Sequence, residues 1–236
     1  MSAARAGALE RLADLIVAVE RPHPVRVAVD GRSGAGKSTL ADELVAPIER
    51  RGRAVVRAEV DDFYRLEVDR HSRARLTAEA FYGAYDHAAL RRLLLDPLGP
   101  GGSRHYRRRW HDGWNEGEID EPERTAPDDA VLLLDGVFLL RPELDPFWDV
   151  RIFVHVDAEQ GLLRGVERDL TLEPPQAPAA ARALRVRRWR ERYLPADDAY
   201  LRAVDPAARA DAVVDNRDLA APRLLPRIVT PRQPGA

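Results

Sequence analysis

The octapeptide Gly31–Ser38, G-R-S-G-A-G-K-S, carries the residues best suited to chemistry. It matches the pattern G-x-x-x-x-G-K-[ST]. Its glycines allow successive backbone N–H groups to point at phosphate oxygens, and a helix beginning near Lys37 would add its positive end. Lys37 is the only lysine in the chain, while the other 36 of the 37 basic residues are arginine. The pattern predicts a site for the phosphates of a nucleoside triphosphate.

Residues of this loop and one distant aspartate are expected to have separate roles in binding the phosphates and the metal ion. Lys37, a compact cation, would reach the β- and γ-phosphates, and Ser38 would ligate Mg²⁺. Asp135 ends the stretch A-V-L-L-L-D-G and is the expected second metal ligand, direct or through water; the alternative is a carboxylate that caps the following turn. The residues expected to bind the phosphates of ATP are Gly31, Arg32, Ser33, Gly34, Ala35, Gly36, Lys37, Ser38 and Thr39.

Five apolar runs predict the buried strands that position these residues. They are 25–29, 54–60, 130–134, 151–156 and 212–214, and helical patterns at 38–51, 78–95, 159–169 and 179–193 separate them. This alternation predicts an α/β fold, a three-layer sandwich with a mostly parallel five-stranded sheet. Ligands bind at the carboxyl ends of such strands, where Asp61, Asp62 and Asp135 fall.

The composition limits the classes of function. The net charge of −2 gives no electrostatic case for nucleic acid or an acidic membrane. The absence of cysteine excludes disulfides, thiol catalysis and Cys-ligated zinc. No apolar run is long enough to span a bilayer, and the N-terminus lacks the apolar core of a signal peptide. Leu9, Leu12, Ile16 and Val19 instead recur at helical spacing. We therefore expect a cytoplasmic protein with an N-terminal amphipathic helix.

The absence of two sequence motifs excludes two common classes of nucleotide-binding protein. The only lysine lies in the glycine-rich loop, so the chain has no N/T-K-x-D motif of the kind with which GTPases read guanine. It also has no L-S-G-G-Q signature, which argues against an ABC-type ATPase. A small-molecule kinase remains, and such an enzyme needs a phosphate cradle, a base, an acceptor pocket and a cationic lid. We expect a single domain with its core at about 25–216, an acceptor-side hairpin excursion at about 97–128 and a lid at about 164–192.

From about Val25 to Asn216 the chain resembles the uridine kinase family, within the uridine kinase, phosphoribulokinase and pantothenate kinase group. The resemblance rests on the loop above and on D-x-F-Y at Asp61–Tyr64. It continues in Y-D-H-A-A-L, L-L-L-D-G-V-F-L-L-R-P-E-L, R-G-V-E-R-D and A-R-A-D-A-V-V-D-N. It implies an ATP- and Mg²⁺-dependent transfer of the γ-phosphoryl group to a hydroxyl of a nucleoside such as uridine or cytidine.

The resemblance also implies roles for acceptor-side residues. Asp61 aligns with the catalytic base and lies near Mg²⁺, and Tyr64 belongs to the same acceptor motif. Asp86 aligns with a carboxylate that binds ribose hydroxyls, and Tyr106 and His111 with residues that contact the base. From the residues alone, Asp62 competes with Asp61, Asp86 equally suits a helix N-cap, and Tyr106 and His111 equally suit packing within a hairpin.

The remaining expectations concern five arginines. The resemblance places Arg164 and Arg168 in a lid that steadies the triphosphate, with Arg168 in the catalytic set. Arg107, Arg108 and Arg109 depart from the family pattern around the base and suit a phosphorylated or carboxylated acceptor better than neutral uridine. A pantothenate- or sugar-phosphate-type kinase therefore stays an alternative.

Two further alternatives come from other classes of protein. The chain could be a non-catalytic ATP sensor, or an RNA-binding module that uses the aromatic–arginine stretch H-Y-R-R-R-W-H-D-G-W. The net charge argues against the RNA-binding module. The expected partner is a small-molecule substrate, with no nucleic acid or membrane, and assembly into a homo-oligomer is left open.

Overall fold

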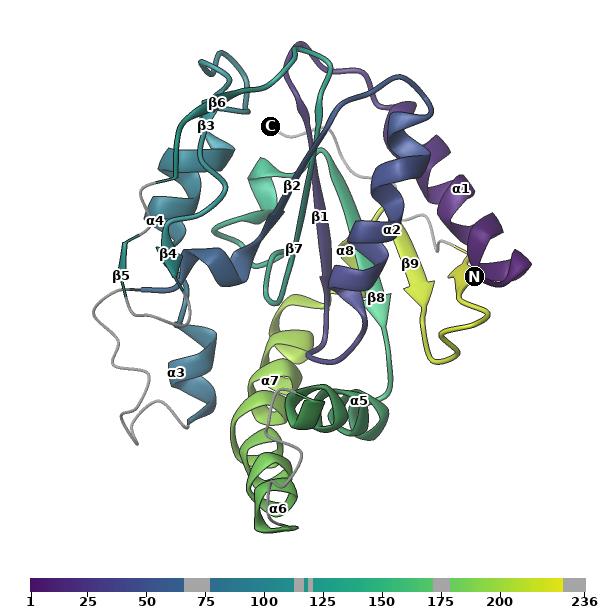
Figure 1. Ribbon diagram of the computed structural model, residues 1–236, viewed down its shortest axis with the longest axis vertical. Coiled ribbons are helices and arrows are strands. Elements are labelled where there is room, and N and C mark those ends of the chain that lie inside the picture. The colour runs from purple at the N-terminus through teal and green to yellow at the C-terminus, as the bar shows by residue number, and fades with distance from the viewer. Residues whose placement is uncertain (66–76, 113–116, 119–120, 172–178, 227–236) are drawn as a thin grey trace.

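The computed structural model describes residues 1–65, 77–112, 117–118, 121–171 and 179–226 (Figure 1). Its strands are β1 (Val25–Gly31), β2 (Val55–Glu59), β3 (His105–Tyr106), β4 (His111–Asp112), β5 (Gly117–Glu118), β6 (Arg124–Thr125), β7 (Val131–Gly136), β8 (Val150–His155), β9 (Ala212–Asp215) and β10 (Arg223–Leu225). Its α-helices are α1 (Ala3–Val17), α2 (Lys37–Glu49), α3 (Ala78–Tyr82), α4 (His87–Leu90), α5 (Ala158–Thr171), α6 (Ala179–Arg188), α7 (Leu194–Val204) and α8 (Pro206–Arg209). Short 3₁₀ segments are η1 (Val60–Phe63) and η4 (Asp145–Phe147), and π-helical turns are η3 (Arg91–Leu95) and η5 (Trp189–Tyr193).

The central sheet has the strand order β10-β9-β8-β1-β7-β2. Strands β2, β7, β1, β8 and β9 pair in parallel, which confirms the five predicted strands. The predicted count of five was nevertheless one too low, because β10 adds an antiparallel sixth strand beside β9. Strand β10 is short and begins with an arginine, so it lacks the continuous apolar pattern that marks the parallel strands.

Helices cover the two faces of this sheet (Figure 1). Alternate residues of one strand enter different cores, since side chains of a strand point to opposite faces. Val131 and Leu133 pack with α1 and α2, whereas Leu132 and Leu134 pack with residues 81–98 and 137–148 and with α7. The predicted N-terminal helix therefore forms part of the first core. No helix in the described part of the chain is long and apolar enough to cross a membrane.

The single helix predicted over 78–95 is wrong. Helix α3 ends at Tyr82, with Gly83 as its C-cap, and α4 begins after Asp86. The carboxylate of Asp86 accepts a hydrogen bond from the N–H of Ala89 at 2.8 Å. Between them Tyr85 forms an antiparallel bridge with Tyr64. The apolar helical pattern of 78–95 therefore gave no sign of three features: the end of α3, the bridge between Tyr85 and Tyr64, and the N-cap of α4 at Asp86.

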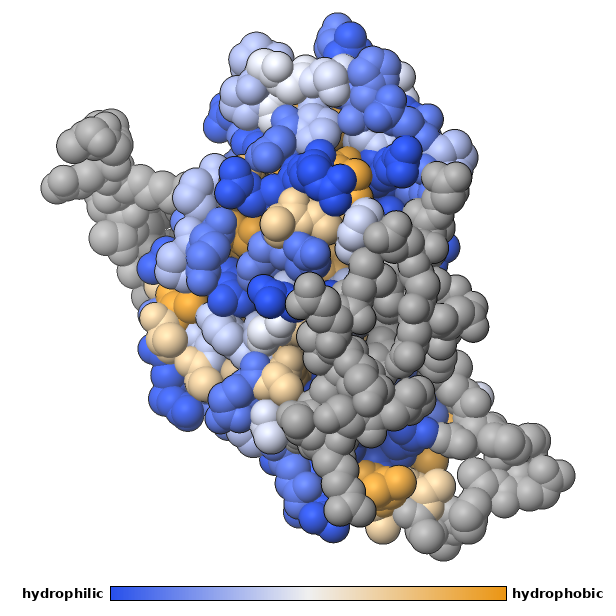
Figure 2. All heavy atoms as spheres, turned by 90° about the vertical axis from the view of Figure 1, so that its left-hand side faces the viewer, coloured by the Kyte–Doolittle hydropathy of each residue, from blue (hydrophilic) through white to orange (hydrophobic). Residues whose placement is uncertain are grey.

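The predicted excursion and the C-terminal helices lie on different parts of the sheet. Two small antiparallel pairs, β3–β6 and β4–β5, form the excursion, as the hairpin prediction required. Figure 2 shows that this side of the molecule is largely hydrophilic, with hydrophobic atoms in small separate patches. Helix α6 continues through η5 into α7, beyond its predicted end, and Figure 1 shows these helices and α5 beyond the carboxyl ends of the strands. Part of the predicted lid, 172–178, lies outside the described residues.

Candidate active site

The glycine-rich loop joins the end of β1 to the start of α2 at the carboxyl edge of the sheet. Gly34 and Gly36 have φ angles of 75° and 86°, in the left-handed region that favours glycine. Gly36 precedes the first turn of α2, so the free N–H groups of that turn face the loop. The Lys37 side chain is buried and donates a hydrogen bond to the carbonyl of Arg32 at 2.8 Å. The loop thus has the form of an anion-binding cradle with one internal cation.

Helix α5 lies so close to this loop that a side chain at the point of contact would not fit. A Cβ added to Gly34 would overlap the carbonyl oxygen of Gly161. A Cβ added to Gly161 would lie 2.8 Å from the carbonyl oxygen of Ser33. Gly34 and Gly161, far apart in sequence, therefore allow the backbone of α5 to contact the backbone of the glycine-rich loop.

Ser38 and Asp135, the two residues predicted to ligate Mg²⁺, are in direct contact. The Ser38 hydroxyl donates to Oδ2 of Asp135 at 2.7 Å, while the guanidinium of Arg57 lies 2.6 Å from Oδ1. Burial raises the pKa of Asp135, opposed by Arg57 and Ser38. The described residues contain no group of three His, Cys, Asp or Glu side chains that could hold a metal. One hydroxyl and one carboxylate still fit Mg²⁺, because Mg²⁺ usually takes few protein oxygens and completes its shell with phosphates and water.

Asp61 lies beside this pair in a cavity of about 130 Å³, here called the smaller cavity. The end of β2 and the turn η1 bring Asp61 there, next to Lys37, Ser38 and Asp135. Aromatic side chains form the other walls of the smaller cavity: Tyr64, Phe81, Tyr85, Trp189 and Tyr193. The glycine-rich loop and a carboxylate thus share one cavity whose other walls are aromatic.

Two other acids at the end of β2 differ from Asp61 in their surroundings. Asp62 accepts a hydrogen bond from Nε of Arg109 at 3.0 Å and does not line the smaller cavity. Glu59 does line it, and burial together with the charge of Asp135 raises the pKa of Glu59 to about 7. The geometry therefore separates Asp61, which faces the phosphate site, from Asp62, which is paired on the excursion side.

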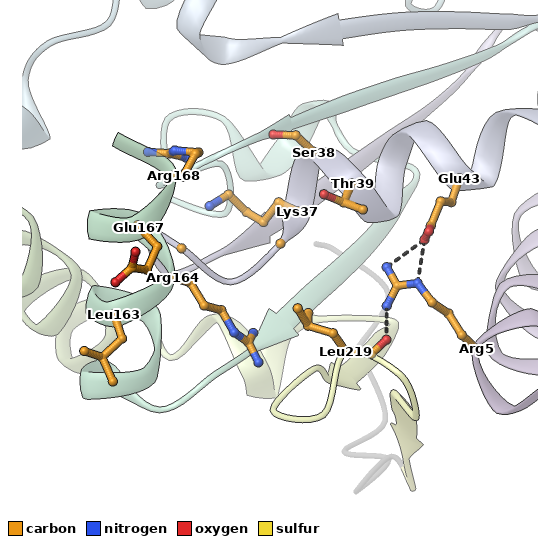
Figure 3. Close-up of a pocket in the computed structure, with 13 residues that line it drawn as sticks. Arg5, Lys37, Ser38, Thr39, Glu43, Leu163, Arg164, Glu167, Arg168 and Leu219 are labelled. Carbon is orange, nitrogen blue, oxygen red and sulfur yellow. Dashed lines mark hydrogen bonds and ion pairs between the residues drawn. The ribbon is translucent and has the colours of Figure 1, made fainter. Parts of the chain in front are cut away.

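A cavity of about 760 Å³, the larger cavity, opens on the other side of Lys37 (Figure 3). The loop and the start of α2 form one wall, and α5 forms another with Leu163, Arg164 and Arg168. Leu219 closes the third side. Arg5, from α1, is fixed there by hydrogen bonds to Glu43 at 2.8 Å and to the carbonyl of Leu219 at 2.9 Å. The larger cavity has the size expected for a small-molecule ligand of several hundred daltons.

The two predicted lid arginines behave differently. Arg164 lines the larger cavity, but its guanidinium donates to the carbonyls of Asn216 at 3.0 Å and Arg217 at 2.7 Å. Arg168 lines both cavities and is largely exposed, and its guanidinium contacts Asp169 at 3.0 Å. Arg168 is thus placed between the cavities, whereas Arg164 fastens α5 to the loop that follows β9.

Two of the predicted acceptor contacts, Asp86 and Tyr106, do not reach the smaller cavity. Asp86 caps α4, and Tyr106 is buried where β3 pairs with β6; neither lines that cavity. The side chain of His111 lies outside the described residues. Arg108 is held by Glu121 at 3.1 Å, and the same carboxylate accepts hydrogen bonds from the N–H groups of Arg108 and Arg109.

Three residues of the site region carry no signal that our sequence analysis used: Arg57, Glu59 and Asp197. Tyr85 entered that analysis only as the first residue of Y-D-H-A-A-L and was given no role. Arg57 is one of 36 arginines, and only the pairing of β2 with β7 brings it to Asp135. Asp197, on α7, accepts hydrogen bonds from the Ser33 N–H at 3.0 Å and hydroxyl at 3.4 Å. Burial raises the pKa of Asp197 to about 6, opposed by Lys37. These contacts join segments that are distant in sequence, so spacing alone could not reveal them.

Comparison with known proteins supports a kinase fold. No family model matches the chain. A uridine kinase from Leuconostoc citreum is 29% identical over 158 residues, which cover 62% of this chain and 69% of the relative. The solved structure of a possible uridine kinase from Bacillus stearothermophilus aligns with a TM-score of 0.66 at 21% identity, over 88% of this chain and 97% of that one. A D-glycerate 3-kinase from Cryptococcus neoformans aligns with a TM-score of 0.53 at 15% identity, over 80% and 87%.

Proposed function

We propose that the chain, which is similar in sequence to uridine kinases and in fold to a possible uridine kinase, transfers the γ-phosphoryl group of ATP to a hydroxyl of a neutral, nucleoside-like acceptor. One observation carries the proposal: Lys37, Ser38, Asp61 and Asp135 line the same small cavity. Phosphoryl transfer consists largely of positioning and charge stabilisation, and these four side chains supply both.

The chemistry assigned to the residues follows from their positions. The loop amides and Lys37 hold the phosphates. Ser38 and Asp135 would hold Mg²⁺, which would supply positive charge against the phosphates. Asp61 accepts the proton of the acceptor hydroxyl. The hydroxyl oxygen then bonds to the γ-phosphorus as the bond to the departing ADP oxygen breaks. Arg168, between the two cavities, is the proposed partner of the moving phosphoryl group.

The proposal assigns the two cavities to the two substrates. The larger cavity, with the loop at its base, suits ATP, and the smaller cavity suits the reacting end of the acceptor. Tyr64 is the acceptor-side aromatic residue, because it lines the smaller cavity beside Asp61. Asp86, Tyr106 and His111 remain proposed contacts for the more distant part of the acceptor.

The charges around the smaller cavity support a neutral acceptor over an anionic one. Glu59, Asp61 and Asp135 face this space, and the two cations that also line it, Lys37 and Arg168, are assigned by the proposal to the phosphates of ATP. Arg108 and Arg109, which could attract a phosphate or carboxylate, are already paired with Glu121 and Asp62. An anionic acceptor would therefore meet carboxylates at the reacting end. The absence of cysteine and the use of ATP fit the cytoplasmic location predicted from the sequence.

An acceptor panel tests the proposed function. The full chain is incubated with Mg²⁺, ATP and one acceptor at a time: uridine, cytidine, pantothenate or a sugar phosphate. We expect acceptor-dependent ADP release and a phosphorylated product, identified by mass spectrometry, with a nucleoside. If product forms only with pantothenate or only with a sugar phosphate, the acceptor belongs to one of the alternative classes and is not a nucleoside. ADP release at background with every acceptor, despite measurable ATP binding, would favour the ATP sensor.

A further inference from the structure

The hydroxyl of Tyr85 makes a hydrogen bond that none of the roles above explains. It donates to Oδ1 of Asp61 at 2.8 Å, and the Tyr85 side chain is only 3% exposed. Tyr85 comes from the irregular segment between α3 and α4, so the contact joins two separate parts of the chain. The donor and its acceptor both line the smaller cavity. A buried phenol thus touches the carboxylate proposed as the base.

The backbone around this contact holds it in one geometry. Tyr64 and Tyr85 form an antiparallel bridge. On either side of it, the N–H of Arg65 donates to Ala84 at 3.0 Å and the N–H of Asp86 donates to Phe63 at 2.7 Å. The rings of Tyr64 and Tyr85 also pack with their centroids 4.9 Å apart. The segment that carries Asp61 and the segment that carries Tyr85 are therefore fixed to each other through main chain and rings.

The surrounding charges keep the phenol in its donor form. Burial, and then the charge of Asp61, raises the pKa of Tyr85 well above its usual value, so the hydroxyl stays protonated. The other charged groups facing this space are Glu59 and Asp135 at the strand ends and Lys37 and Arg168 at the phosphate site. Asp62, beside Asp61, is turned to Arg109. Tyr85 therefore keeps its proton at neutral pH and can donate it to Asp61 in a hydrogen bond.

We propose that Tyr85 is a positioning residue for the phosphoryl-transfer reaction. Its hydroxyl binds Oδ1 of Asp61, which leaves Oδ2 to accept the proton of the acceptor hydroxyl. A hydrogen bond to a carboxylate also favours the charged form that a base requires. This role rests on the proposed function, because it concerns the orientation of the base in that reaction.

The variant Tyr85→Phe tests the role, because it keeps the ring and its packing and removes the hydroxyl, which donates to Asp61 and also hydrogen-bonds with the Tyr64 side chain. We expect kcat to fall about 3- to 30-fold, in the range of losing a useful hydrogen bond of about 0.7–2 kcal/mol. The dissociation constant of ATP should stay within about twofold. The acid limb of the pH profile of kcat/KM should move to higher pH, since the carboxylate loses a donor that favours its charged form.

Tyr82→Phe is the matched control. Tyr82 packs against Phe138 and under the guanidinium of Arg141, and it does not line the smaller cavity. The control should have wild-type kcat and a wild-type pH profile. An active wild type whose Tyr85→Phe variant keeps its kcat and acid limb overturns the positioning role, as does a loss of stability without a shift of that limb. A wild type inactive with every acceptor contradicts the proposed function itself, and the positioning role with it.

Discussion

The close contact between α5 and the phosphate loop makes Gly161→Ala an informative perturbation. The new methyl carbon would lie 2.8 Å from the carbonyl oxygen of Ser33, about 0.6 Å short of ordinary contact at 3.4 Å. Gly161 lies inside α5, so the backbone itself tolerates alanine, and helix propensity favours it by about 1 kcal/mol. The overlap must be relieved by moving α5 or the loop, at a typical overpacking cost of about 1–3 kcal/mol.

The net effect should be small on folding and larger on ATP binding. We expect the free energy of unfolding to fall by about 0–2 kcal/mol. The dissociation constant of MgATP should rise about tenfold, which corresponds to about 1.4 kcal/mol, because the carbonyl that moves belongs to the phosphate-binding loop. Titration calorimetry measures the binding, and chemical denaturation of the ligand-free protein measures the stability.

Gly7→Ala is the control for this experiment. Gly7 lies in α1, where an added Cβ would meet only Nη1 of Arg11 at 3.7 Å. That variant should gain about 0.5–1 kcal/mol of stability and bind ATP like the wild type. If Gly161→Ala also binds MgATP with wild-type affinity, the contact between α5 and the loop does not set the shape of the phosphate site, and the reasoning fails.

Three further outcomes follow from the site geometry. The pKa of Asp197 is raised to about 6 from an unfolded value near 4, so the folded state binds this proton more tightly and the stabilisation is lost as pH rises from about 4 through 6. Asp197→Asn should remove up to about 3 kcal/mol of that pH dependence, measured by denaturation at pH 4–7; an unchanged profile would show that Asp197 is not the titrating group. Ser38→Ala should raise the Mg²⁺ concentration for half-maximal ADP release about tenfold, and an unchanged Mg²⁺ dependence would remove Ser38 from the metal site. Lys37→Ala should lower kcat at least about 100-fold in a folded protein, and a wild-type rate would contradict the phosphate-site assignment.

The sequence predicted the parts of this fold that repeat a simple pattern. The parallel strands are buried on both faces and appear as continuous apolar runs, so five of the six strands of the central sheet were predicted correctly. The glycine-rich loop followed from local backbone requirements that Gly34 and Gly36 meet. The break within 78–95 was missed because Gly83 and Asp86 are also compatible with an uninterrupted amphipathic pattern.

The contacts that complete the site depend on long-range pairing. Arg57 meets Asp135 only because β2 lies beside β7, and Asp197 meets Ser33 only because α7 packs across the carboxyl edge of the sheet. The ion pairs of Arg108 and Arg109 likewise depend on contacts that spacing does not reveal. Both appeared free to bind an anionic acceptor, and the fold pairs them with Glu121 and Asp62.

The central claim is that Asp61 serves as the base beside a working phosphate site, and one comparison of variants tests it most directly. Acceptor-dependent turnover and MgATP affinity are measured for the wild type, Asp61→Asn and Asp62→Asn. We predict that Asp61→Asn loses at least about 100-fold in kcat while its affinity for MgATP stays within about threefold, and that Asp62→Asn retains most of the activity. Near-wild-type turnover of Asp61→Asn, or a loss confined to Asp62→Asn, would contradict the claim.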